Sequence, residues 1–369
     1  MKYNWQQNEW PEFSYDLQDV EDALYTFAQQ VGRISGALKA MPEDTQVETL
    51  INTMVAEAIK SSEIEGEHLN REDVVSSIRR NLGLDKTTKQ VKDKKAKGAA
   101  ELMIEVRNGY ANKLTQKMLF EWHSILMQHN PNIIIGNWRD SEDPMQVVSG
   151  AYGREKVHFE APPAKDIPHE MKGFIEWFNA TAPKGAKEIK HAPVRAAIVH
   201  LYFETIHPFE DGNGRIGRAI AEKALSQTVG RPILLSLSAV IEAHKKDYYN
   251  ALEKAQLGNE ITPWLVYFID TILKAQDQAE ILIEFTLNKT KFFDSYKDRL
   301  NARQLKAVKR MLDEGADGFV GGMNAKKYMS ITKTSKPTAT RDLQNLLELG
   351  AFSVIGGGRS TRYYLNLKG

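Results

Sequence analysis

One segment constrains the fold more than any other, because it joins two apolar helices through a short glycine-bearing connection. Between His191 and Ile206 apolar side chains recur at helical spacing. Pro208 ends this helix, since proline lacks a backbone donor and restricts the residue before it. A second helix is expected from near Asn213 to Gly230, where a glycine suits the stop. The connection therefore runs directly into a helix N-terminus.

That N-terminus has the chemistry of a phosphate site. Free backbone N–H groups and a partial positive charge of about half a unit favour an anion there. Gly212 and Gly214 let the backbone approach the anion closely. Arg215 and Arg218, on the first turns, add bidentate donors for phosphate oxygens. The pattern predicts that phosphate groups bind at this connection.

Two further side chains make the connection reactive. His207 can act as a general base. Asp211 suits Mg²⁺, which prefers oxygen ligands and usually shares them with substrate phosphates. A capped loop with a structural histidine explains either residue alone, but not both together with the glycines and arginines. A metal and two arginines would neutralise a triphosphate, so that its α-phosphorus becomes open to attack and pyrophosphate can leave.

Composition sets the wider frame. With 369 residues, 42% of them hydrophobic, the chain can bury more than one core, which suggests two or three domains. The absence of cysteine excludes disulfides and thiolate metal sites. The net charge of +1 favours no particular partner. The chain starts without an apolar leader and contains no apolar run long enough for a membrane, so we expect a cytoplasmic protein with no membrane contact.

We expect a mostly α-helical protein in three parts. Residues 1–97 form a helical region, with a buried stripe around Ile51 and a lysine-rich, solvated stretch at its end. Residues 98–290 form a helical core. Its one break has β-prone runs at 146–149 and 156–160 around a glycine-bearing turn, which predicts a small β-hairpin.

The third part, residues 300–369, is basic. From Asn301 onward it has twelve lysines and arginines against five acids. Helices are expected at Arg303–Leu312, Ala325–Ser330 and Thr338–Leu349, followed by a glycine-tipped hairpin that carries Arg359 and Arg362. This order resembles a winged helix. DNA binding and protein docking are both open for it.

The connection from His207 to Arg218 resembles the signature of the Fic family of protein adenylyltransferases. The family pattern is His-Pro-Phe-x-Asp/Glu-Gly-Asn-Gly-Arg-x-x-Arg, and every fixed position is filled. The similarity extends to Trp138-Arg139, Pro162-Pro163 and Asp247-Tyr248-Tyr249. It implies the transfer of AMP from ATP, with Mg²⁺, to a Ser, Thr or Tyr hydroxyl of a target protein or of the chain itself. Many such proteins are dimers.

The resemblance also assigns roles. It implies that His207 deprotonates the acceptor hydroxyl, that Asp211 holds Mg²⁺ and that Arg218 binds the γ-phosphate. An anion hole for the α- and β-phosphates would comprise Gly212, Asn213, Gly214 and Arg215. The residues at the positions where the family contacts adenine and ribose are Tyr248, Tyr249 and Gln256. A flap that holds the target segment by strand addition would consist of Val157, His158, Phe159 and Glu160.

A second motif lies ahead of the core. The helix with the Ile51 stripe continues to Gly66, which fits a helix stop, yet Glu63 and Glu65 put negative charge where the helix dipole disfavours it by about 0.3–1 kcal/mol. A compensating cation or solvent is expected there. Ser61-x-x-x-Glu65-Gly66 resembles the Fic inhibitory motif of members inhibited from the N-terminal side.

By that resemblance Glu65 pairs with Arg218 and keeps the γ-phosphate from its productive position. Ser61, one turn earlier, is placed to hydrogen-bond the Glu65 carboxylate and orient it. The same carboxylate could instead position a water that hydrolyses an AMP–protein ester. Both roles are open.

Two alternatives remain. Relatives of the Doc toxin kinase type carry a lysine in the glycine-rich loop, so Gly214 favours AMP transfer; phosphocholine-transferring members differ around the nucleotide pocket. The other alternative is a DNA-binding regulator in which the winged helix does the work and the core is sensory. Intact His207, Asp211 and Arg218 argue against an inactive core.

Overall fold

The computed structural model describes residues 2–84, 91–149, 156–316 and 318–367. The chain divides into two compact units, one with the residues up to Arg33 and Leu50–Asp277, the other with Ile34–Thr49 and the residues from Gln278 onward. Three helices have residues in both units: α1 (Glu21–Lys39), α2 (Glu43–Ile64) and α11 (Thr262–Tyr296). The predicted 1–97 and 98–290 regions therefore both contribute to the first unit, and their division into domains stays a prediction.

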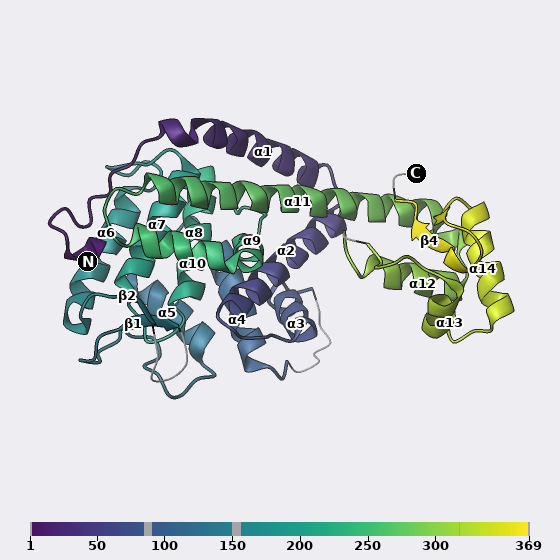
Figure 1. Cartoon of the computed structure of the whole chain (residues 1–369), viewed down its shortest axis with the longest axis horizontal. Helices are drawn as coiled ribbons and strands as arrows, with labels where there is room; N and C mark the ends of the chain where they lie inside the picture. The colour runs from purple at the N-terminus through teal and green to yellow at the C-terminus, as the bar shows by residue number, and fades with distance from the viewer. Residues whose placement is uncertain (1, 85–90, 150–155, 317, 368–369) are drawn as a thin grey trace. The chain divides into compact units, whose positions relative to one another are not determined.

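The first unit is built from helices, as expected. Helix α7 packs against α6 and α8, and α8 packs in turn against α4 and α9 (Figure 1). The helices that lie wholly in this unit are α3 (Arg71–Asn81), α4 (Lys94–Asn108), α5 (Gln116–Met127), α6 (Ile167–Ala180), α7 (Ala192–Ile206), α8 (Asn213–Val229), α9 (Leu237–Ala243) and α10 (Lys245–Ala255). Among the described helices, none has the length and apolarity that crossing a bilayer requires.

Helices α7 and α8 lie on either side of the glycine-bearing connection, as predicted. Every residue of α7 is buried, which is why its apolar side chains occupy all faces of the helix. Its C-cap, His207, adopts the left-handed conformation with a φ of 51°. Gly212, with a φ of 83°, then starts α8, which ends at the left-handed Gly230. The loop between the two helices is thus fixed at both ends by backbone geometry.

The predicted hairpin is present. Strands β1 (Gln146–Ser149) and β2 (Lys156–Glu160) pair antiparallel, with an irregularity between Val147 and Val148. The turn expected at 150–153 lies outside the described residues. The chain's first described residues support the hairpin: the Trp5 indole donates to the Glu160 carbonyl at 2.8 Å, and the Tyr3 ring meets Phe159 edge-on.

The second unit contains the helices and the terminal hairpin expected for residues 300–369. They are α12 (Ala302–Leu312), α13 (Ala325–Thr332), α14 (Lys336–Glu348), β3 (Phe352–Ile355) and β4 (Arg362–Leu365). Helix α14 begins two residues before the predicted start because Pro337 suits a first helical turn. The hydrophobic core of the second unit includes Tyr328, Leu343 and Phe352. The side chain of Arg359 lies outside the described part of the chain. The winged-helix assignment itself stays a prediction.

Candidate active site

The loop between α7 and α8 is held in place by side chains. Asn213 accepts the Phe209 N–H at 2.9 Å and donates to the Phe209 carbonyl at 2.8 Å, so its buried amide closes the loop on itself. His123 lies behind the loop, with its ring stacked on Phe209 at 4.1 Å and its Nε2 3.2 Å from the Asp211 carbonyl. The Asn213 side chain therefore fixes the loop, and its backbone N–H is what remains for an anion.

Arg139 ties this loop to the hairpin. Its Nε donates to the His207 carbonyl at 2.8 Å, and its Nη2 donates to the Pro162 carbonyl at 2.5 Å. Burial lowers the pKa of Arg139 to about 10. The sequence marks Arg139 and Pro162 only as part of the family resemblance, and neither was predicted as a site residue.

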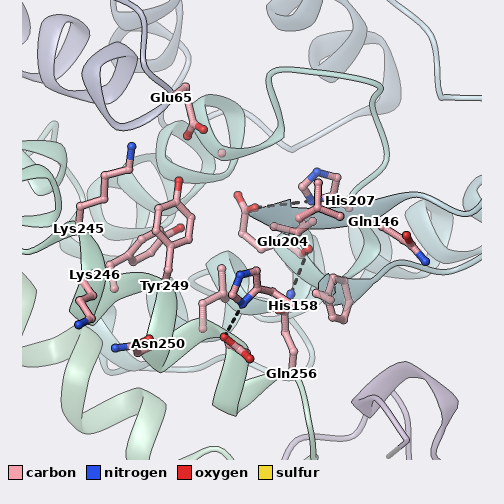
Figure 2. A pocket seen from close by; sticks show the side chains of 17 residues that line it. Glu65, Gln146, His158, Glu204, His207, Lys245, Lys246, Tyr249, Asn250 and Gln256 are labelled. Atoms are coloured by element: carbon pink, nitrogen blue, oxygen red, sulfur yellow. Dashed lines mark hydrogen bonds and ion pairs between the residues drawn. The ribbon is translucent and has the colours of Figure 1, made fainter. Parts of the chain in front are cut away.

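His207 has the protonation state of a base. Burial, and then the charge of Arg139, lower the pKa of its imidazole to about 4. The ring is therefore neutral at pH 7 and able to accept a proton. Its side chain is 16% exposed and lies on the wall of a pocket (Figure 2).

This pocket has a volume of about 790 Å³, which is within the usual range for ligand sites. It brings together residues from the end of α2, the hairpin, the α7–α8 loop and α10 (Figure 2). The predicted site residues on its wall are Glu65, His158, Phe159, His207, Gly214, Tyr248, Tyr249 and Gln256. Of the predicted flap, Val157 and Glu160 do not line it.

The three residues predicted to contact the nucleoside differ in their environment. Tyr248 is buried, and its hydroxyl lies 2.9 Å from Nε2 of His200. Gln256 is buried too and donates to the Glu204 carbonyl at 3.3 Å. Tyr249 is only partly buried, and its ring is the part of this group most open to a ligand (Figure 2).

The segment after α2 reaches Arg218, as predicted. One Glu65 carboxylate oxygen lies 2.8 Å from Arg218 Nη2, and Gly66 has the expected left-handed φ of 79°. Burial acts to lower the pKa of Arg218, but Glu65 outweighs it and the pKa is raised. Among the described residues the Ser61 hydroxyl forms a hydrogen bond with Arg218, and its predicted hydrogen bond to Glu65 stays a prediction. The Ser61 hydroxyl accepts from Arg218 Nε at 3.0 Å, because the arginine lies between the two residues.

A second carboxylate, which no sequence motif predicted, binds the other arginine. Glu67 Oε2 lies 2.5 Å from Arg215 Nη1, while Glu67 Oε1 lies 2.8 Å from Lys95 and 3.7 Å from His129. Burial acts to raise the pKa of Glu67, but these cations lower it, so the carboxylate is charged. Its only signal in the sequence is its position two residues after Glu65.

Helix α2 is anchored to the segment that leads into α10. The Glu57 carboxylate accepts the Ser236 hydroxyl at 2.7 Å and the Ser238 backbone N–H at 3.0 Å. Near the end of the helix, Lys245 donates to the Ile64 carbonyl. A lysine thus satisfies the negative end of the helix dipole. These contacts fix where Glu65 and Glu67 lie.

One carboxylate on the loop is suited to a metal ion. Asp211 is 48% exposed, and its Oδ1 accepts the Gly212 N–H at 2.6 Å. Within the described residues no three side chains of the metal-binding types cluster together. A single carboxylate fits Mg²⁺ that arrives with a nucleotide, because Mg²⁺ commonly takes one or two carboxylates and completes its shell with phosphates and water.

Comparison with known proteins identifies two domains within the chain. Residues 113–225 match the Fic/DOC family, and residues 3–84 match a domain of unknown function, DUF4172. The chain contains a Fic/DOC domain. The match covers the α7–α8 loop with all of its predicted phosphate-binding positions and ends ahead of α10.

Relatives of the Fic domain include protein adenylyltransferases. The one from Nematostella vectensis is 32% identical over 105 residues, which cover 28% of this chain and 22% of that protein. The one from Aedes aegypti is 27% identical over 165 residues, or 44% of this chain and 29% of that protein. The chain thus matches between a fifth and a third of the length of these curated relatives.

A solved structure has the same fold over most of the chain. It is a Fic family protein from Desulfovibrio desulfuricans, with a TM-score of 0.52 and 22% identity. The match covers 94% of this chain and 97% of that one. The Fic fold, with its small hairpins on a helical body, is therefore shown beyond the 113–225 match.

Proposed function

We propose that this Fic protein transfers AMP from ATP to a hydroxyl of a target protein. The observation that carries the proposal is the neutral His207 on the wall of a nucleotide-sized pocket, next to the N-terminus of α8. Arg215 and Arg218 lie on the first turns of that helix, where α- and γ-phosphates would find both backbone N–H groups and guanidinium donors.

In this reaction the acceptor O–H gives its proton to His207, and its oxygen forms a bond to the α-phosphorus. The bond from that phosphorus to the bridging oxygen breaks, and pyrophosphate leaves. Asp211 would hold Mg²⁺ with the phosphates, and the ion supplies charge neutralisation there. Gly212, the backbone of Asn213 and Gly214 leave room for an anion close to the loop.

The hairpin would position the acceptor. Strands β1 and β2 form a two-stranded sheet, so the outer edge of each strand is not paired with another strand of the described residues. Such an edge can bind an extended segment of another protein by strand addition. Val148 and Val157 are 48% and 42% exposed on this hairpin and offer apolar contact to that segment.

The segment after α2 would inhibit the reaction. Glu65 pairs with Arg218 and Glu67 pairs with Arg215, so both guanidinium groups that would bind phosphate are already bonded to carboxylates. ATP that enters the pocket cannot then place its γ-phosphate on Arg218. DUF4172, whose match contains both glutamates, would thus be the inhibitory part of the chain.

A labelling experiment tests the transferase proposal. Purified Glu65→Gly protein is incubated with Mg²⁺ and ATP labelled either at the α- or at the γ-phosphate, and pyrophosphate is measured in parallel. AMP transfer predicts protein label from the α-position only, together with pyrophosphate release. Label from the γ-position would assign a kinase reaction instead.

The exposed face of α14 favours a second function, DNA binding. The buried face of this helix holds Ala339, Leu343 and Leu346, and the exposed residues opposite include Lys336, Thr340, Arg341 and Gln344. Such side chains contact phosphates and base edges when a helix enters the major groove. A gel shift of the full chain should give retention that weakens in Lys336→Ala/Arg341→Ala and with rising salt. Equal retention of both proteins would exclude this face.

A further inference from the structure

We infer that Glu204 positions the catalytic base. Its carboxylate accepts the Nδ1–H of His207, while His207 Nε2 takes the proton of the acceptor hydroxyl. The inference rests on the proposed AMP transfer. Glu204 lies one turn before His207 on α7, and both side chains line the same pocket (Figure 2). Its Oε2 is 3.9 Å from His207 Nδ1.

Both groups lack their hydrogen-bond partners within the described part of the chain. His207 Nδ1 and Glu204 Oε1 are buried polar atoms with no partner there. A buried polar atom left without a partner costs about 1–3 kcal/mol, so such atoms are retained where a function needs them. A small rotation of either side chain brings the carboxylate within hydrogen-bond distance of the ring.

The neighbouring helix is built to admit this carboxylate. A Cβ atom on Gly217 of α8 would collide with Glu204 Oε1, so glycine at this position is what allows Glu204 to lie between the two helices. Gly217 is the second of the two variable positions between Arg215 and Arg218 and is not among the predicted phosphate-binding residues. The close approach of α7 and α8 at this point therefore serves Glu204.

The electrostatic setting determines when Glu204 can act. Burial raises the pKa of Glu204 to about 8, Arg218 opposes this and Glu65 adds to it. The carboxyl is therefore largely uncharged at neutral pH and becomes a stronger acceptor as it ionises above pH 8. The other titratable groups that face the pair are His200 on α7, Tyr248 and Tyr249 on α10, and Arg139 and Asp211 beside His207.

A rival acceptor for the Nδ1–H is the main-chain carbonyl of Glu204. It accepts a hydrogen bond from Gln256 at 3.3 Å, and its interaction with the imidazole acts to raise the pKa of His207. The Glu204→Gln variant distinguishes the main-chain carbonyl from the side-chain carboxylate. It keeps the carbonyl and the shape of the side chain and removes only the carboxylate.

The test compares Glu204→Gln with its parent in the Glu65→Gly background, where kcat and KM for ATP are measured from pH 6.5 to 9. At the upper end of this pH range, where Glu204 is ionised, we expect kcat to fall by about 10²–10⁴-fold, as for a lost orienting carboxylate behind a histidine base. The KM for ATP should stay within about twofold, since among the described residues no hydrogen bond joins the Glu204 side chain to Arg215 or Arg218. Loss of Glu65 lowers the pKa of Glu204 in this background, so the parent's kcat should rise with pH below pH 8, and this rise should disappear in Glu204→Gln.

Two further variants complete the design. Glu222→Gln is the matched control, because burial also raises the pKa of Glu222 to about 8, although this residue does not line the pocket; its kcat should be unchanged. Glu204→Asp keeps a carboxylate on a shorter stem and should have an intermediate kcat. Unchanged kcat and pH profile in Glu204→Gln, or an equal loss of ATP binding, would overturn the inference. Absence of AMP transfer in the Glu65→Gly parent would instead reject the proposed function.

Discussion

At the scale of single residues, His207 combines a chemical role with an unusual backbone. A φ of 51° is disfavoured for most side chains, and asparagine is among the few that tolerate it. Arg139 donates to the His207 carbonyl and so holds this conformation in place. The base is thus fixed by the main chain as well as by its side chain.

We predict that His207→Asn and His207→Ala both lose AMP transfer, by about 10²–10⁴-fold or more, because each lacks the base. Both should still bind ATP, since neither change touches Arg215 or Arg218. Labelling from α-labelled ATP and calorimetric titration with ATP measure the two effects. His207→Asn is the cleaner variant because asparagine accepts the left-handed backbone. Substantial transfer by either protein would exclude His207 as the base.

The residues that the sequence predicts well are those whose chemistry depends on local spacing. His207, Gly212 and Arg218 belong to one continuous signature, and the structure places them on a single loop and helix start. His123 and Arg139 escaped prediction because their contacts with this loop span dozens of residues. No local sequence pattern around a single histidine or arginine predicts such a long-range contact.

At the scale of elements, α2 is the structure that connects DUF4172 with the active site. Its apolar stripe predicts a buried helix, and Ile51, Val55 and Ala58 are buried. The sequence also indicates that the negative charge at the C-terminal end of α2 needs a nearby cation. The partner of each carboxylate depends on tertiary packing: Glu63 pairs with Lys60 of the same helix, whereas Glu65 and Glu67 reach α8.

We predict that the two carboxylates inhibit together. Glu65→Gly and Glu67→Gln should each raise AMP transfer, and the double variant should exceed both, because each change frees a different arginine for phosphate. Rates of labelling from α-labelled ATP measure the effect.

The matched control for this series is Glu63→Gln. It removes a carboxylate from the same segment, but one that pairs within α2, so the rate should stay at the wild-type level. If Glu67→Gln left the rate of AMP transfer unchanged both in the wild type and in Glu65→Gly, Glu65 alone would account for inhibition.

At the scale of the whole molecule, burial of ionisable groups links stability to pH. Burial raises the pKa of Glu222 from 4.5 to about 8, with Glu57 adding to the shift and Arg107 opposing it. The folded chain therefore keeps a proton that the unfolded chain releases between pH 4.5 and 8. Stability contributed by this proton is present below pH 4.5 and is lost as the pH rises through 8.

We predict that Glu222→Gln gains stability relative to the wild type as the pH rises from 4.5 to 8, because glutamine has no proton to lose. The difference should reach a few kcal/mol at most. Urea unfolding midpoints of both proteins at several pH values measure it. A difference that is constant across this range would mean that Glu222 ionises normally in the folded chain.

Intact-mass spectrometry shows which group, if any, the protein transfers from ATP to itself. Glu65→Gly and Glu65→Gly/His207→Asn proteins are incubated with ATP and Mg²⁺, and their masses are compared with those of untreated samples. We expect an AMP adduct on the first protein and none on the second, because only the first has the base. A phosphate adduct, or no adduct on a folded Glu65→Gly protein that binds ATP, would contradict it.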